Sequence, residues 1–181
     1  MDYQFNSGWG ANNMQEAMAI IAPKSHKCIN FALNFGAFGE RLGNAETIFL
    51  AVEKLLGIPL FQFQQATSSN KKFVEVLENI SLVAQKHSRT CLLVAGGFLD
   101  EYVTTSALAA LAYGLDVYLL HDFMICGEPK YEHAFLRRLA QAGTVSTTLH
   151  QCLFQWALEP ENEPNNELIM KLAKELAAVG D

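Results

Sequence analysis

Cysteine and histidine are the side chains of this sequence that are best suited to nucleophilic or metal chemistry. The four cysteines show no CxxC spacing, and the five histidines show neither HxH nor HExxH spacing. Such spacings place two ligands on one metal ion, so the sequence predicts no metal site. The cysteines are Cys28, Cys91, Cys126 and Cys152, and the histidines are His26, His87, His121, His133 and His150.

Cys126 is the cysteine whose position best suits a nucleophile. It lies in the loop MICGEP, shortly after an apolar run that is followed by His121 and Asp122. A thiol needs a neighbouring base or cation to become a thiolate, and His121 is close in sequence. The other three cysteines lie in apolar stretches, where a free thiol serves as a small core residue. Cys126 is therefore a candidate nucleophile, although a loop cysteine without a catalytic role explains the same residues.

The second candidate site is the glycine pair Gly96–Gly97, which follows the continuous apolar run CLLVA. Ligands of parallel sheets bind beyond the carboxyl ends of the strands, and two glycines allow the chain to turn sharply there. The patterns GxGxxG and GxxxxGK[ST] are both absent, so no nucleotide cofactor is predicted, nor any other cofactor. Asp100 and Glu101 fit the start of a helix, because the helix dipole favours negative charge there.

The elements that would position these residues alternate along the chain. Strand-like apolar patterns at 28–35, 58–63, 91–95, 115–120 and 144–149 alternate with helical patterns at 44–56, 73–86, 101–113 and 131–142. A helix through Trp156 follows, then the stretch EPENEPNNE as a polar linker, then a last amphipathic helix at 167–179. We therefore predict an α/β fold with three α-β-α layers, in which a mostly parallel, five-stranded, Rossmann-like sheet has helices on both faces.

The stretch CLLVAGGFLDEYVTTSALAALAYGLDVYLLHDF resembles the signature of the isochorismatase-like cysteine hydrolases. The segment EHAFLRRLAQAGTVSTTLHQCLFQW resembles the YcaC-like branch of that family, and GNAETIFLAVEKLLGIPLFQFQ resembles the family's first helix and second strand. The resemblance implies a hydrolase-family fold, symmetric oligomers and an Asp–Lys–Cys catalytic triad.

The triad positions of the family are not matched in this sequence. The nucleophilic cysteine falls at Tyr102, and a phenol cannot easily replace a thiolate in acyl transfer. The general-base aspartate falls at Ala32 or at Asn34, depending on the register, and neither side chain can take up a proton. The family's lysine lies on a strand and lid that are reduced here to ATSSN. The resemblance therefore implies a degenerate member that lacks the triad.

These observations predict a protein that has lost family-type hydrolysis and acts as an oligomeric scaffold or a small-ligand binder. An amide or ester hydrolase with a relocated nucleophile such as Cys126 is the alternative. Asp122 matches a strand-end aspartate of the family, for which we expect a structural role in holding loops through backbone hydrogen bonds. The predicted ligand pocket consists of Asn34, Gly97, Phe98, Leu99 and Tyr102.

Composition limits the possible partners and the compartment. A formal net charge of −6 argues against a nucleic acid or an anionic membrane as partner. Only 18% of the residues are charged, which favours a surface partly covered by further copies of the chain, a homo-oligomer. The absence of a signal-like start and of long apolar runs predicts a cytoplasmic protein.

Three parts of the chain are distinguished. Residues 1–26 are predicted as an N-terminal arm, 27–160 as the isochorismatase-like domain and 161–181 as a C-terminal helix. Trp9 in the arm, together with Phe154 and Trp156, provides candidate interface anchors. The small side chains of VTTSALAALA fit either close packing on the sheet or a subunit contact.

Overall fold

The computed structural model describes residues 22–33, 40–64 and 70–178. Its strands form one parallel sheet in the order β2-β1-β3-β4-β5. They are β1 (Cys28–Leu33), β2 (Leu60–Phe63), β3 (Cys91–Gly96), β4 (Asp116–Leu120) and β5 (Val145–Thr147). The predicted α/β class and the five parallel strands are therefore confirmed.

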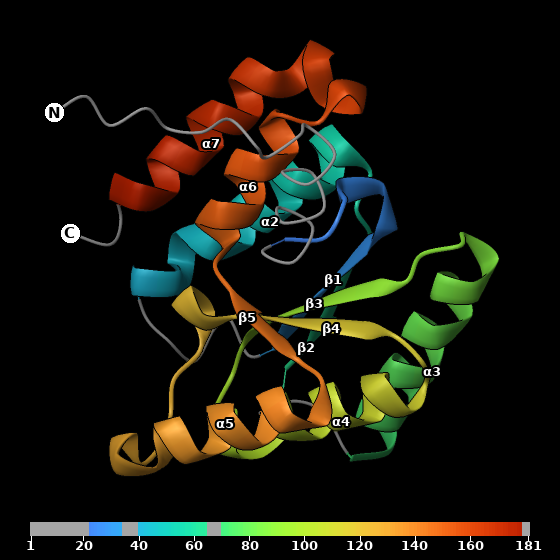
Figure 1. Ribbon diagram of the computed structural model, residues 1–181, viewed down its shortest axis with the longest axis vertical. Helices are drawn as coiled ribbons and strands as arrows, with labels where there is room; N and C mark the ends of the chain where they lie inside the picture. The colour runs from blue at the N-terminus through green and yellow to red at the C-terminus, as the bar shows by residue number, and fades with distance from the viewer. Residues whose placement is uncertain (1–21, 34–39, 65–69, 179–181) are drawn as a thin grey trace, which may run out of the picture.

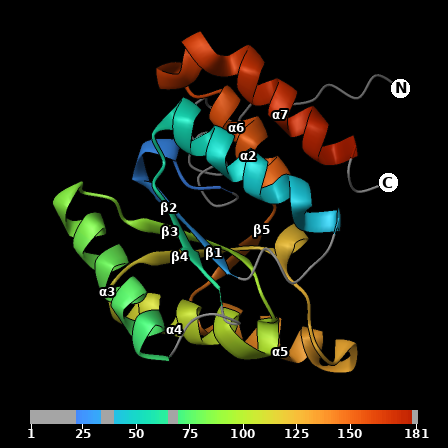
Figure 2. The same cartoon turned by 180° about the vertical axis from the view of Figure 1, so that it is seen from behind.

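Helices cover both faces of the sheet (Figures 1 and 2). On one face lie α2 (Glu40–Leu56), α6 (Leu149–Ala157) and α7 (Asn166–Ala178). On the other lie α3 (Asn70–Lys86), α4 (Thr104–Ala112) and α5 (Glu132–Ala142). Two apolar clusters fill the space between the sheet and these two layers, which is why β1 and β3 are buried along their whole length. In the described part of the chain, no helix is long and apolar enough to cross a membrane.

Two elements differ in kind from the predicted ones. The helix expected from residue 101 begins as a wide π-type turn, Leu99–Val103, in which Glu101 has φ −119° and ψ −109° and breaks the regular path. Regular α4 therefore starts only at Thr104. The predicted polar linker is instead a 3₁₀ segment, Pro160–Asn165, which leads directly into α7.

That 3₁₀ segment is held by the buried side chain of Asn162. Its amide nitrogen donates to the Trp156 carbonyl at 2.9 Å and to Ser25 Oγ at 3.1 Å. The Trp156 indole in turn donates to the Pro23 carbonyl at 2.8 Å. Residues 22–25 are thus packed on α6 and the 3₁₀ segment, although they fall within the predicted arm; the rest of that arm, 1–21, lies outside the described residues.

Candidate functional site

The candidate site lies at the carboxyl edge of the sheet, where β3 turns into α4. Gly96 and Gly97 have φ values of +74° and +77°, a backbone conformation that glycine adopts without strain. A Cβ on Gly96 would overlap the Leu33 carbonyl oxygen, so the close approach of β3 to the end of β1 also requires glycine. The two glycines are therefore explained by the backbone conformation of the turn and by its close packing on β1.

The turn is braced by the loop that follows β4. The Leu99 amide donates to the Ile125 carbonyl at 2.7 Å, and the Ile125 amide donates to the Gly97 carbonyl at 3.3 Å. Asp100 and Glu101 lie in the first turn of the wide helical turn Leu99–Val103, as expected for negative charge at a helix start. Asp100 also accepts a hydrogen bond from the Gly127 amide at 3.3 Å, so its carboxylate holds this loop. The sequence placed Gly97–Leu99 and the loop of Cys126 at one edge of the sheet, and the structure brings them side by side.

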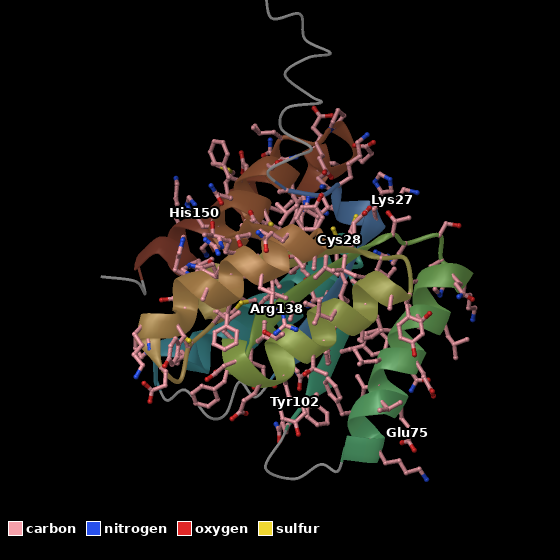
Figure 3. All side chains as sticks on the ribbon, turned by 60° about the horizontal axis from the view of Figure 1, so that its bottom comes forward. Lys27, Cys28, Glu75, Tyr102, Arg138 and His150 are labelled. Carbon is pink, nitrogen blue, oxygen red and sulfur yellow. The ribbon has the colours of Figure 1, made fainter. Side chains whose placement is uncertain are left out.

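Tyr102 belongs to an aromatic cluster. Its ring centroid lies 5.3 Å from that of Phe63 at the end of β2 and 4.9 Å from that of Phe73 in α3, the latter with the rings nearly perpendicular. Phe63 and Phe73 are themselves 5.0 Å apart and buried. Figure 3 shows Tyr102 toward the start of α3, far from Lys27 and Cys28 at the other ends of the strands. Sequence reasoning did not identify Phe63 and Phe73 as its neighbours.

The other predicted pocket residues differ in how far they reach the surface. Phe98 and Tyr102 are half-buried, whereas Leu99 and Gly97 are buried. Leu99 belongs to the apolar cluster beneath α4, so its side chain contributes to the core. Asn34 lies outside the described residues. The other register for the family's general base, Ala32, is buried in β1 with a relative exposure of 1%.

Cys126 is buried, and within the described ranges no histidine or acidic side chain forms a hydrogen bond with its thiol. Its thiol donates to the Glu128 carbonyl at 3.2 Å, and its relative exposure is 7%. His121 is bonded instead to Glu132, with His121 Nε2 3.0 Å from Glu132 Oε1. In this structure, therefore, the neighbouring histidine is not positioned to deprotonate the thiol.

Asp122 has the structural role that the sequence predicted. Its carboxylate accepts a hydrogen bond from the Leu149 amide at 2.9 Å and so joins the end of β4 to the start of α6. Part of the Asp122 residue is exposed. Partial burial of its carboxyl group removes water from it and raises the pKa of Asp122 to about 6, although the amide hydrogen bonds act in the opposite direction.

Two other arrangements bear on the site. Within the ranges that the structure describes, no three His, Cys, Asp or Glu side chains gather closely enough to hold a metal ion. A hollow with a volume of about 350 Å³ lies at the amino-terminal end of the sheet between α3 and α4, with Ser81, Arg89 and Tyr113 in its lining. It contains none of the predicted site residues.

The sheet order and the two helical layers define a class: three-layer α/β proteins with a parallel five-stranded sheet. No protein-family model and no curated protein matches the sequence.

Solved structures do match. The MAR1 ribonuclease from Caenorhabditis elegans is 12% identical with a TM-score of 0.63, over 84% of this chain and 92% of the other. YcaC from Pseudomonas aeruginosa, with hexane-2,5-diol and covalent acrylamide, is 13% identical with a TM-score of 0.58, over 87% and 96%. The Escherichia coli YcaC product, described as an octameric hydrolase of unknown specificity, is 14% identical with a TM-score of 0.50, over 86% and 98%. The chain has the fold of these proteins, as the resemblance to the YcaC-like branch predicts.

Proposed function

We propose that this chain is a non-catalytic protein with an isochorismatase-like fold that works as an oligomeric scaffold. The observation that carries the proposal is the aromatic cluster of Phe63, Phe73 and Tyr102 at the nucleophile position of the resembled family. Aromatic pairs at such separations stabilise a fold by about 0.5–1.5 kcal/mol each, which gives Tyr102 a structural reason to be there.

The chemistry of the remaining positions supports the same conclusion. Acyl transfer needs a nucleophile and a group that accepts its proton. Tyr102 carries a phenol, which is a poor substitute for the thiolate of a cysteine nucleophile. Ala32 offers no proton acceptor, and the amide of Asn34 is not basic. Because the parts of such a triad act as a unit, loss of all of them removes most of the rate.

Binding of a small ligand at this edge is the second part of the scaffold hypothesis. The half-buried rings of Phe98 and Tyr102 provide apolar surface beside the turn. The oligomeric part is supported by the low charge of the chain and by the octameric E. coli YcaC structure.

The hydrolase with Cys126 as nucleophile remains the alternative, because Cys126 lies in the loop that pairs with Gly97–Leu99. Its burial and its bond to a backbone carbonyl disfavour it, since a reactive thiol needs exposure and a neighbouring positive charge.

A hydrolysis assay tests the proposal. Wild type, Tyr102→Phe, Cys126→Ser and the control Cys152→Ser are incubated with p-nitrophenyl esters and with primary amides at pH 7. We expect all four proteins to match the uncatalysed rate. Turnover that is lost only in Cys126→Ser would establish the alternative, and turnover that is lost only in Tyr102→Phe would show that the phenol is a nucleophile; either result contradicts the proposal.

A further inference from the structure

The exposed side of α5 carries positive charge without partners. Arg137 and Arg138 are both exposed, and in the described part of the chain neither forms an ion pair or hydrogen bond with an acidic side chain. His133 lies one turn before Arg137 and is also exposed. The acid of this helix, Glu132, is bonded to His121. The charge of this side is therefore not neutralised within the chain.

An aromatic side chain stands at the start of the same helix. Tyr131 is 49% exposed, and the Lys130 ammonium lies 4.9 Å from its ring centroid. Arg138 follows Tyr131 by two helical turns. Tyrosine and arginine are, together with tryptophan, enriched among the side chains that dominate the binding energy of protein interfaces. We call the surface of Tyr131, His133, Arg137 and Arg138 the basic face.

A surface of the opposite character lies where α6 leads into α7. Glu161, Glu163 and Glu167 are exposed, and no ion pair to any of them occurs among the described residues. Leu158 and Leu168 flank them with exposed fractions of 59% and 50%. Negative charge and exposed apolar side chains thus occur together here. We call these five residues the acidic end.

The two surfaces cannot meet within one chain. α5 and α7 lie on opposite faces of the sheet, with the whole sheet between them (Figure 1). They can meet between two copies, because each supplies what the other lacks: unpaired cations with an aromatic ring against unpaired carboxylates with leucines. A contact between two different surfaces leaves one of each free, so it continues into a ring or a filament.

We propose that the basic face of one copy docks on the acidic end of a second copy, which makes the chain assemble head to tail. This inference rests on the oligomeric part of the proposed function and specifies its surfaces. Charge complementarity sets the register of the contact, and Tyr131 with the two leucines supplies apolar burial.

Charge reversal on each side tests the contact. Arg137→Glu with Arg138→Glu makes the basic face acidic, and Glu161→Lys with Glu163→Lys makes the acidic end basic. In light scattering behind size exclusion, each double variant is expected to dissociate at concentrations about tenfold or more above those at which wild type does. An equimolar mixture of the two variants regains assembly, because every contact between unlike copies is again complementary. The matched control, Lys54→Glu with Lys86→Glu, keeps the wild-type mass.

Circular dichroism confirms that the variants fold, and rescue by mixing cannot arise from misfolded chains. A wild type that stays monomeric at low salt overturns both this inference and the oligomeric part of the proposed function. Assembly that is unchanged in both charge variants overturns this inference alone. A parallel binding experiment with single-stranded oligouridine checks whether the basic face binds RNA instead of a second copy. If the wild type does not self-assemble but binds this RNA, and Arg137→Glu with Arg138→Glu abolishes the binding, the head-to-tail contact is also contradicted.

Discussion

Asn30 has a fully buried side chain, and among the residues that the structure describes its amide nitrogen and oxygen find no hydrogen-bond partner. It lies in the middle of β1, with Leu60 of β2 and Leu93 of β3 as its neighbours in register. A buried polar group without partners costs about 1–3 kcal/mol. An apolar residue of similar size would remove this cost.

We therefore expect Asn30→Leu to raise the free energy of unfolding by about 1–2 kcal/mol in urea denaturation. The control is Asn162→Leu, which loses the bonds to Trp156 and Ser25 and is expected to lower it by a similar amount. If Asn30→Leu destabilises as much as Asn162→Leu does, the amide of Asn30 has a partner in solution.

Asp122 predicts a pH dependence. Its pKa in the folded protein is about 6, compared with an ordinary value of 3.8. The folded state therefore binds this proton more tightly than the unfolded state does. The resulting contribution to stability is complete below about pH 3.8 and is lost as the pH rises through about 6.

Urea denaturation between pH 4 and 7 measures this contribution as the difference between wild type and Asp122→Asn. The free energy of unfolding of wild type should rise relative to that of Asp122→Asn as the pH falls. An NMR titration of the Asp122 carboxyl carbon should give a midpoint near 6. A constant difference, or a midpoint near 4, would contradict the account.

Among the elements, the turn between β3 and α4 depends most on particular residues. Gly96 and Gly114 both have positive φ, +74° and +78°, but a Cβ on Gly114 would meet no atom within 4 Å. Gly114→Ala should therefore cost only the backbone strain, about 1 kcal/mol. Gly96→Ala adds an overlap with the Leu33 carbonyl and should cost about 3 kcal/mol or more in thermal or urea unfolding. Equal losses in the two variants would show that β1 and β3 are farther apart at this end.

The order of the elements could be predicted because it is carried by local patterns. The continuous apolar run of β3 and the 3.6-residue periodicity of α3 are readable without tertiary information. The late start of α4 could not be predicted from the sequence, because the wide turn around Glu101 depends on Asp100 binding the loop after β4. The segment Pro160–Asn165 was missed because its order depends on Asn162 reaching Ser25 from a distant part of the chain.

For the molecule as a whole, the resemblance predicted that Tyr102 lies in the turn after β3 but not which residues surround it. The register with the family placed Tyr102 at the turn, and the structure confirms that it lies there. Phe63 and Phe73, which pack on its ring, come from β2 and α3, and only the folded chain brings them together.

The central claim is that this chain has no activated nucleophile at the carboxyl edge of the sheet. Acrylamide tests it directly, since it is found covalently bound in the YcaC structure from P. aeruginosa. At pH 7, mass spectrometry should show that acrylamide alkylates no cysteine of the folded protein faster than it alkylates the thiol of free glutathione. In urea, all four cysteines should react. Rapid modification of Cys126 in the folded protein, abolished in Cys126→Ser, would contradict the account.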